Sequence, residues 1–401
     1  MPRKRIHIIG GGVAGLRTAC CLCTSHEVHI YEKGKSPGQK MLIAGKGGFN
    51  ITNNLPKEEA VSKYAPPGFL DEALAGFDAR ATRNWMAELG IPTFVGSSGR
   101  VFPEKGIKAI DVLRKIQDFL IENGTAIHLR HEFTGFDPSL NPVVRHGNEQ
   151  STLLADYTVF SMGGASWPST GSNGNWKAIF DSAGFGTKPF ESSNCGIQIP
   201  WPESILFHHA GKPLKNIRLR VNGKESKGEA LITDTGLEGN AVYPLVPEIR
   251  DLLRSRKEIR ISLDFKPFNS REELVQKVST HSVSPREYAQ LFNLNPAQLA
   301  VIKAFSDKES YLSPLRFAGI LKDLSLPVLS LRPVEESIST VGGVLTSGLN
   351  TDFSLKKHPA FFTIGEMVDW DAPTGGFLMQ ACFSMGNHVA KAIIKRAEQA
   401  V

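Results

Sequence analysis

Three glycines near the start of the chain have the spacing of a dinucleotide-binding turn. Gly10, Gly12 and Gly15 lie between the run 4–9 (Lys-Arg-Ile-His-Ile-Ile), which predicts a strand, and the largely apolar stretch 13–24, which predicts a helix. Gly10 permits a tight turn, Gly12 lets the backbone approach a pyrophosphate, and Gly15 lets the helix pack closely on the strand. The N-terminus of the helix would add partial positive charge. The residues expected to bind a cofactor here are Gly10, Gly12, Val13, Ala14 and Gly15.

An acidic residue stands where such a motif needs one. The run 28–31 predicts a second strand, and Glu32 follows it directly. A carboxylate at this position can accept hydrogen bonds from both hydroxyls of an adenosine ribose, and it would repel the 2′-phosphate of NADP. Strand, helix, strand and terminal acid together favour a dinucleotide site over a chance glycine-rich turn. They leave NAD and FAD open, and Lys33 is included in the predicted site.

Three later segments favour FAD, although each alone is equally compatible with an ordinary glycine turn. The loop 38–53 is too polar and too rich in glycine for a core element, and it suits a long ligand with many acceptors. The segment 161–168 closes a predicted strand. In the third segment Glu366 could hold a ribitol hydroxyl, and two glycines would aim the dipole of the last helix at the flavin. The further residues predicted to bind FAD are Lys40, Gly45, Gly47, Asn50, Thr52, Asn53, Phe133, Gly163, Gly164, Gly365, Glu366, Asp369, Gly375, Gly376, Phe377 and Gln380. Because residues 31–127 contain no histidine or cysteine, non-covalent FAD is expected.

The order of these motifs resembles that of the BaiN-like family of NAD(P)/FAD-dependent flavoproteins. The likeness runs nearly end to end, through the segments 40–53, 99–103 (Gly-Arg-Val-Phe-Pro), 163–172, 228–236 and 365–380. It implies a cofactor domain related to those of fumarate reductase and glutathione reductase flavoproteins. The best understood activity of the family implies NAD(P)H-linked reduction of a carbon–carbon double bond conjugated to a ketone.

The chain departs from the family pattern at three places. Gly48-Phe49 replaces a usual Arg-Cys pair, Glu238-Gly239-Asn240 replaces Ser-Gly-Pro, and Leu378 stands where asparagine is common. These changes spare the predicted FAD contacts and alter polar groups that could face a substrate. They indicate a divergent subfamily.

The pattern of elements predicts an α/β protein with a Rossmann-type FAD-binding domain, interrupted by an insert. Short strands from 126 to 160 predict an antiparallel meander whose last strand is 157–161. Residues 190–265 are strand-rich and 270–325 are helical in pattern, without a nucleotide motif. The expected domains are an FAD-binding domain in two parts, 1–188 and 340–401, and an inserted β-rich and helical substrate or cap domain, 189–339.

Composition disfavours several other classes of protein. The chain has 401 residues with 41% hydrophobic and 21% charged residues, as expected for a globular protein. Its net charge of +6 comes from scattered lysines and arginines, so a nucleic-acid face is disfavoured. The sequence contains no run of about 18 apolar residues, so no membrane span is predicted. The five cysteines, among them the Cys20-x-x-Cys23 pair, suggest helix packing and a reducing, cytoplasmic setting.

No catalytic residue can be assigned from the sequence, but two cations are candidates. Arg100 could bring its guanidinium near the flavin or could equally anchor its loop. Lys46 could contact flavin or an anionic substrate, although a solvent-exposed role is favoured. His208-His209 has no further ligand at metal spacing, so no metal site is predicted.

The absence of a second glycine fingerprint bears on the electron donor. NAD(P)H would bind transiently over the flavin, or electrons would come from another donor. We therefore expect an FAD-dependent oxidoreductase acting on a small organic molecule. The alternatives are a flavoprotein that acts on or binds RNA and a non-catalytic FAD-binding protein. The substrate, the donor and the oligomeric state stay open.

Overall fold

The computed structural model describes residues 3–44, 48–256, 258–279 and 283–399. The chain divides into two compact units, unit 1 (1–191 and 339–401) and unit 2 (192–338). The unit boundaries lie within a few residues of the expected domain boundaries. The functions that the sequence suggests for these domains stay predictions.

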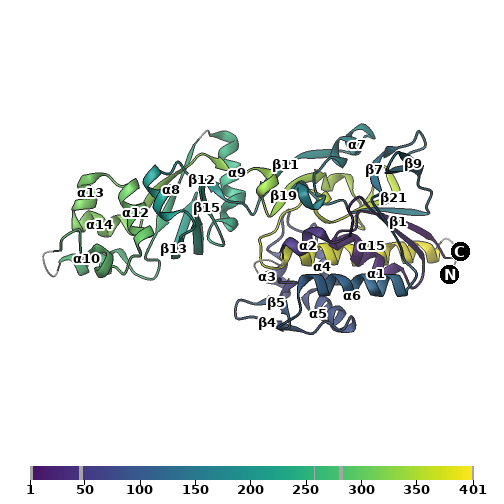
Figure 1. The fold of residues 1–401 in the computed structure, drawn as a ribbon, viewed down its shortest axis with the longest axis horizontal. Helices are drawn as coiled ribbons and strands as arrows, with labels where there is room; N and C mark the ends of the chain where they lie inside the picture. Colours follow the sequence, from purple (N-terminus) through teal and green to yellow (C-terminus); the bar gives the residue numbers. More distant parts are fainter. Residues whose placement is uncertain (1–2, 45–47, 257, 280–282, 400–401) are drawn as a thin grey trace. The chain divides into compact units, whose positions relative to one another are not determined.

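Unit 1 is built on a six-stranded sheet in the order β20-β21-β10-β1-β2-β6 (Figure 1). All neighbouring strands are parallel except β20 and β21 at one edge. The predicted opening strand–helix–strand unit is present, so the α/β class with a Rossmann-type parallel sheet is confirmed. The strands are β1 (Arg5–Ile9), β2 (Glu27–Glu32), β6 (Ala126–Leu129), β10 (Tyr157–Phe160), β20 (Ser354–Leu355) and β21 (His358–Thr363).

Two helices from opposite ends of the chain run side by side on one face of this sheet, α1 (Val13–Leu22) and α15 (Phe377–Gln399) (Figure 1). Glycines permit the close approach: a β-carbon on Gly386 would lie 2.7 Å from the carbonyl oxygen of Ala14. The other helices of unit 1 are α2 (Gln39–Ala44), α3 (Lys57–Val61), α4 (Asp71–Gly76), α5 (Ala79–Glu88), α6 (Ala109–Glu122) and α7 (Trp176–Ser182).

The predicted meander is correct only in its middle. The antiparallel strands are β7 (Glu132–Phe136), β8 (Pro142–His146) and β9 (Glu149–Thr152). The flanking strands β6 and β10, which we assigned to the meander, belong to the parallel sheet. Strand β10 is buried on both faces, as central strands of a parallel sheet are. Helix α6 precedes β6 and supplies the crossover connection that lets β6 lie parallel to β2.

The sheet face opposite α1 is aromatic. Phe133 of β7 packs edge-to-face on Phe160 of β10, with ring centroids 5.6 Å apart. On the same face, His29 and His128 stack at 5.3 Å, and the buried His7 packs against His29 at 5.4 Å. The two faces therefore differ in chemistry, since Ile8 and its neighbours on the α1 face are aliphatic.

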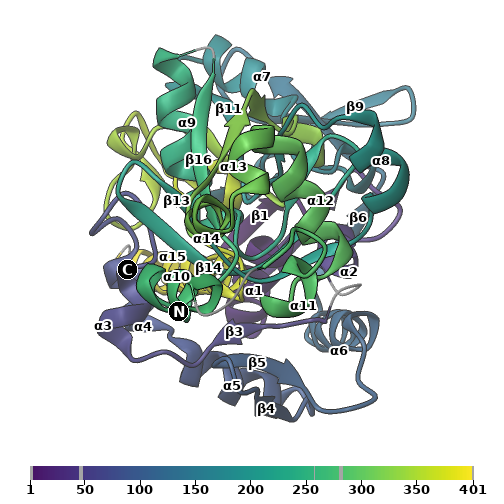
Figure 2. The ribbon, with the colours of Figure 1, turned by 90° about the vertical axis from the view of Figure 1, so that its left-hand side faces the viewer.

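The expected loop at 33–54 contains short regular elements. Helix α2 forms because Met41 buries its side chain, and Gly38 lies against Leu113 of α6. Strand β3 (Thr52–Asn53) joins β5 (Arg100–Pro103) and β4 (Thr93–Val95) in a small antiparallel sheet, order β3-β5-β4, beside α5 (Figure 2). Another small sheet pairs β11 (Thr187–Ser193) with β19 (Ser339–Val344).

Unit 2 has its own core of aliphatic and aromatic side chains around a seven-stranded antiparallel sheet, order β17-β16-β13-β14-β15-β12-β18. Strand-rich and then helical sequence was expected, and this is the order observed. The strands are β12 (Ile197–Gln198), β13 (Pro213–Val221), β14 (Lys224–Ile232), β15 (Gly236–Glu238), β16 (Ile259–Asp264), β17 (Leu324–Val328) and β18 (Ser330–Leu331). The helices are α8 (Glu203–His209), α9 (Val246–Ser255), α10 (Arg271–Ser279), α11 (Tyr288–Leu291), α12 (Pro296–Phe305), α13 (Lys308–Leu312) and α14 (Pro314–Ile320).

Candidate cofactor site

Residues predicted to bind a cofactor gather at one edge of the parallel sheet. Gly10 follows β1, Glu32 ends β2, Gly163 lies shortly after β10 and Gly365 lies shortly after β21. The carboxyl ends of parallel strands meet at the same edge, where open α/β sheets bind ligands. A β-carbon on Gly10 would lie 2.5 Å from the carbonyl oxygen of Ser161, and one on Gly365 would lie 3.2 Å from the β-carbon of Ala14. The fold therefore brings the separate sequence motifs together.

Gly12 differs from the glycines around it because its surroundings leave room for a side chain. It caps α1 with φ −75° and ψ −179°, which any residue adopts. The nearest atom to a β-carbon placed there is the carbonyl oxygen of Ser161, at 3.7 Å. The first N–H groups of a helix have no intrahelical acceptor. The N–H groups at the start of α1 and the absence of a side chain at Gly12 fit the close approach of a phosphate.

The carboxylate of Glu32 is held by two glycine amides. Gly11 donates its N–H to Oε2 at 2.8 Å, and Gly34 donates to Oε1 at 2.7 Å. Each carboxylate oxygen can accept a further hydrogen bond, so ribose hydroxyls still have acceptors. Lys33 donates to Oδ1 of Asn173 at 3.0 Å, and burial lowers the pKa of Lys33.

Lys40 and Glu366, which come from distant motifs, form an ion pair. The Lys40 ammonium lies 2.5 Å from Oε2 of Glu366 and donates to Ser166 at 2.6 Å. Beside them Gly164 packs tightly, since a β-carbon there would lie 2.1 Å from Oγ1 of Thr340. Ser166 and Thr340 were not predicted. Ser166 lies inside the motif 163–172, which could have pointed to it, whereas Thr340 carries no such signal.

Two asparagines of the glycine-rich loop carry buried polar atoms without partners. Within the described part of the chain, Nδ2 of Asn50 and Oδ1 of Asn53 form no hydrogen bond. The other amide atom of Asn53 donates to the carbonyl of Gly375 at 3.2 Å, so the loop lies against the turn that precedes α15. Buried polar groups without partners are costly and rare. A ligand with both a donor and an acceptor would satisfy them, so these residues fit a flavin ring.

Several predicted residues use their side chains within the protein. Thr52 donates to Oε1 of Gln380 at 2.6 Å, and Gln380 donates to the carbonyl of Phe77 at 2.8 Å. Oδ1 of Asp369 accepts the N–H of Gly342 at 2.9 Å. These bonds join α15 and β3 and hold the chain around β19. Their contact with a cofactor stays a prediction.

The remaining predicted residues are placed as follows. The ring of Phe133 packs in the aromatic cluster below the meander, and Phe377 is buried, with its carbonyl accepting from Tyr64 at 3.0 Å. The carbonyl of Gly163 accepts from the indole of Trp176 at 2.9 Å. Gly376 lies against Thr52. Gly45, Lys46 and Gly47 lie outside the described residues.

The cysteines near this site are free thiols. Burial raises the pKa of both Cys20 and Cys23, and it raises the pKa of Cys382 on α15 to about 12. A thiolate is the nucleophilic form of cysteine, and these environments suppress it. The Cys20-x-x-Cys23 spacing therefore fits helix packing.

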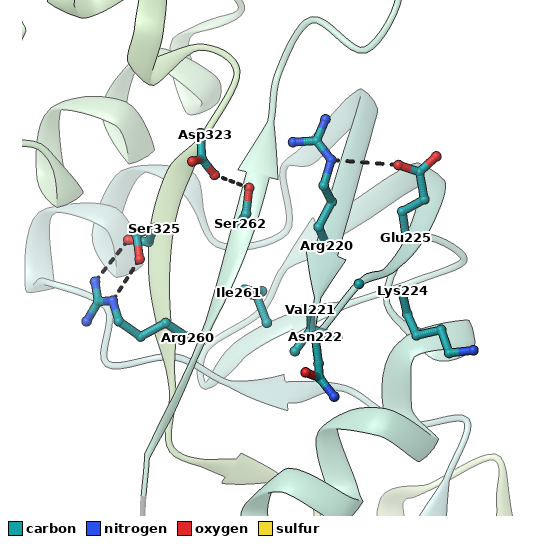
Figure 3. Close-up of a pocket in the computed structure, with 11 residues that line it drawn as sticks. Arg220, Val221, Asn222, Lys224, Glu225, Arg260, Ile261, Ser262, Asp323 and Ser325 are labelled. Atoms are coloured by element: carbon teal, nitrogen blue, oxygen red, sulfur yellow. Dashed lines mark hydrogen bonds and ion pairs between the residues drawn. The ribbon is translucent and has the colours of Figure 1, made fainter.

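Unit 2 contains an open pocket of about 340 Å³ on the strands β13, β14, β16 and β17 (Figure 3). Several of its charged and polar groups bond to one another: Arg220 to Glu225 at 3.7 Å, Arg260 to Ser325 at 2.7 Å, and Ser262 to Asp323. No residue predicted to bind a cofactor lines it. The sequence motifs thus point to the sheet edge of unit 1.

Neither a metal site nor a membrane-spanning helix is present among the residues that the structure describes. No group of three histidine, cysteine, aspartate or glutamate side chains there could hold a metal ion. None of these described helices combines the length and the apolar composition that a membrane span requires.

Comparison with known proteins gives relatives that span the whole chain. The chain is 23% identical to a 3-dehydro-bile acid delta(4,6)-reductase from Clostridium scindens, over 98% of this chain and 100% of that protein. It is 24% identical to a ribosomal RNA dihydrouridine synthase from Escherichia coli, over 96% of each. Among solved structures, a 3-ketosteroid-delta4-(5alpha)-dehydrogenase from Rhodococcus jostii RHA1 shares the fold, with a TM-score of 0.52, 12% identity and 97% of each chain covered. The family model described as the HI0933-like protein Rossmann domain matches residues 4–392, and the chain therefore belongs to the HI0933-like family.

Proposed function

We propose that this chain is an FAD-dependent oxidoreductase that passes hydride through flavin to a carbon–carbon double bond conjugated to a carbonyl. The proposal is carried by the glycine turn and Glu32 at one edge of the parallel sheet, together with the partnerless buried atoms of Asn50 and Asn53 in the loop against the turn before α15. Ligands of open α/β sheets bind at that edge. Family membership supports the same reading.

The residues of the site suit the parts of FAD in order. The start of α1 behind Gly12 would hold the pyrophosphate, and Glu32 would accept from the adenosine ribose. The Lys40–Glu366 pair would meet the ribitol, and Asn50 and Asn53 would meet the ring. Bound FAD supplies the centre that accepts and donates hydride. The chain would orient that ring, and the dipole of α15 would stabilise negative charge on it.

The relatives suggest the class of substrate. One is named for reduction of a 3-dehydro-bile acid, and two are named for synthesis of dihydrouridine in ribosomal RNA. The double bond that is saturated when uracil becomes dihydrouracil is conjugated to a ring carbonyl, as an enone double bond is. Both names thus describe hydride addition to one chemical class, and we place the substrate of this chain in that class, with NAD(P)H as the donor.

A second candidate is that the conjugated double bond belongs to a base in RNA. The RNA-modifying relatives match at 24% and 25% identity over nearly the whole chain, and the net charge is +6. RNA binding driven by phosphate contacts weakens steeply with salt. Filter binding to ribosomal RNA between low and moderate salt, followed by dihydrouridine analysis of the RNA, separates this candidate from a small-molecule reductase.

The proposal is tested on the purified protein. We expect yellow protein with one FAD that acid precipitation releases, and we expect NADH or NADPH to bleach it without oxygen. An enone should then restore the yellow colour. Flavin that stays with the precipitate would disprove non-covalent binding, and flavin that neither nicotinamide reduces would disprove the donor.

The placement of FAD is tested by Glu32→Ala. Loss of charge-assisted hydrogen bonds to the ribose should lower the affinity for FAD by about 10- to 150-fold, measured by titration of the apo-protein. Because the same carboxylate holds Gly11 and Gly34, Glu32→Gln is the control that keeps a neutral acceptor in place. Unchanged affinity in Glu32→Ala would put the cofactor elsewhere.

A further inference from the structure

The outer face of the small sheet β3-β5-β4 carries a cation and an aromatic pair. Along β5, Arg100 and Phe102 point to one side, and Val101 points to the other side, where it is fully buried. The strand register sets Asn53 beside Arg100 and Phe94 beside Phe102. Neighbouring residues in register share a face of the sheet. These four side chains, Asn53, Phe94, Arg100 and Phe102, form what we call the β5 face.

The guanidinium of Arg100 stands over the turn that opens α15. A β-carbon on Gly375 would lie 3.5 Å from Nε of Arg100 and 3.9 Å from one of its terminal nitrogens. Arg100 is partly buried, yet its guanidinium forms no hydrogen bond or ion pair with any residue that the structure describes; only its backbone is bonded, within the sheet and to Gly96. An arginine that anchored its loop would bond to a carbonyl or a carboxylate of that loop. A guanidinium in this state is suited to a ligand anion, because its planar donors match carboxylate and phosphate.

The aromatic pair beside Arg100 is open to solvent. The rings of Phe94 and Phe102 stack with centroids 5.6 Å apart, and 47% of Phe94 is exposed. Glycines border the pair: β-carbons on Gly96 and Gly48 would lie 3.2 Å and 3.8 Å from the ring of Phe102. Exposed aromatic rings suit a flat apolar molecule. Gly48 belongs to the loop that we expect to hold the flavin.

We propose that the β5 face binds the molecule that exchanges hydride with the flavin, and that this molecule joins a flat ring to a carboxylate or phosphate held by Arg100. The inference rests on the proposed function, since it takes the flavin to lie at the turn of Gly375 and Gly376. The ring would cover Phe94 and Phe102. The anion could belong to a carboxylated acceptor or to the phosphates of NAD(P)H, and the two arms of the test separate these sources.

The first arm uses biphenyl-4-carboxylate and its uncharged amide as probes, titrated into the flavin-loaded protein and followed by flavin absorbance. Arg100→Gln should lower the affinity for the carboxylate by about 10- to 150-fold and change the affinity for the amide by less than about threefold. Arg100→Lys, which keeps the charge, should recover part of the loss. Arg80→Gln, an exposed arginine of α5, is the matched control and should change neither probe.

The second arm measures anaerobic reduction of the flavin by NADH and by NADPH in the same variants. If Arg100→Gln lowers only the affinity for the carboxylate probe, the anion that Arg100 binds belongs to the acceptor. If it lowers only the rate of flavin reduction by NADH or NADPH, the anion belongs to the donor. Phe94→Ser removes an exposed ring, so the protein should fold, and both biphenyl probes should weaken together.

The outcomes that overturn the inference differ from those that overturn the function. A flavin-loaded protein whose Arg100→Gln variant keeps wild-type affinity for the carboxylate and wild-type reduction rates overturns this inference alone. Equal losses of carboxylate and amide in Arg100→Gln, with no recovery in Arg100→Lys, also overturn it, because charge would then play no part. A protein that binds no flavin overturns the proposed function and this inference with it.

Discussion

Both units carry a glycine-containing motif, but the surroundings of the glycines differ. In unit 2, β-carbons on Gly236 and Gly228 would lie 1.9 Å from the carbonyl oxygen of Ile197 and 2.4 Å from Oδ1 of Asn240. In unit 1, Gly10 is equally crowded, whereas Gly12 has no neighbour closer than 3.7 Å and an ordinary backbone conformation. A crowded glycine is explained by packing. An uncrowded glycine at the start of a helix has no such explanation within the fold, and a phosphate supplies one.

The motif at 228–236 is accordingly structural in most of its residues. Between β14 and β15 the chain turns sharply: Thr233 donates its N–H to the carbonyl of Gly236 at 2.8 Å, and Gly236 donates to Oγ1 of Thr233 at 3.0 Å. Asp234 lies at the tip of this turn, exposed. The exposed carboxylate of Asp234 is therefore available to act on a molecule outside the fold.

The largest expected effect is that of Gly236→Ala. The added methyl group would overlap backbone atoms of β12, which cannot move without breaking the sheet. We expect a loss of more than about 3 kcal/mol in the free energy of unfolding, seen as an early transition in thermal melting by circular dichroism. Gly348→Ala is the control, because no atom lies within 4 Å of its added carbon. If Gly236→Ala melted at the wild-type temperature, crowding would not explain this glycine, and the contrast between the two units would be wrong.

The next largest effect is a loss of folding stability at low pH, and it arises in unit 1. Burial, together with the nearby His29, Arg5 and His128, lowers the pKa of His7 to about 4, against a small opposite effect of Glu27. Folding therefore favours neutral His7. This contribution is complete above the unfolded pKa of about 6.5 and is lost as the pH falls towards 4, by about 3 kcal/mol at most.

Denaturant unfolding at a series of pH values measures this loss. His7→Phe keeps a ring against Tyr31 and His29 but cannot titrate, so its stability should fall less between pH 6.5 and pH 4. Equal losses in both proteins would show that other groups of unit 1 govern its acid sensitivity.

Local features of the sequence predicted much of this fold. Contacts between residues far apart in the sequence could not be predicted in the same way. The glycine turn and Glu32 could be predicted because strand, turn and helix follow one another directly. The place of β6 and β10 in the parallel sheet could not, because a strand does not encode its partners. Lys40 and Glu366 were each predicted to bind FAD, but their ion pair spans 326 positions and exists only in the fold. The internal bonds of Thr52 and Gln380 were missed for the same reason.

A smaller effect on stability is expected for Gly12→Ala, together with a large effect on the cofactor. The methyl group fits the apo-protein without contact closer than 3.7 Å, so thermal melting without flavin should change by less than about 0.5 kcal/mol. The same group would occupy the space of the pyrophosphate, and FAD should bind at least about tenfold more weakly. A variant that binds FAD as the wild type does would remove the distinction between the two kinds of glycine.

The smallest effect on stability is expected for Asp234→Asn, which tests whether unit 2 selects the substrate. The side chain is exposed and forms no hydrogen bond or ion pair in the described chain, so stability should stay within about 0.5 kcal/mol, and FAD affinity should move by less than about 1 kcal/mol. We expect altered turnover or substrate preference, because packing does not explain an acid at this position. Thr233→Val is the matched control: it loses the turn bond to Gly236, costs about 1 kcal/mol in melting experiments, and should leave kinetics unchanged. Wild-type kinetics of Asp234→Asn on every substrate would make the motif wholly structural, and loss of FAD would assign it to the cofactor site.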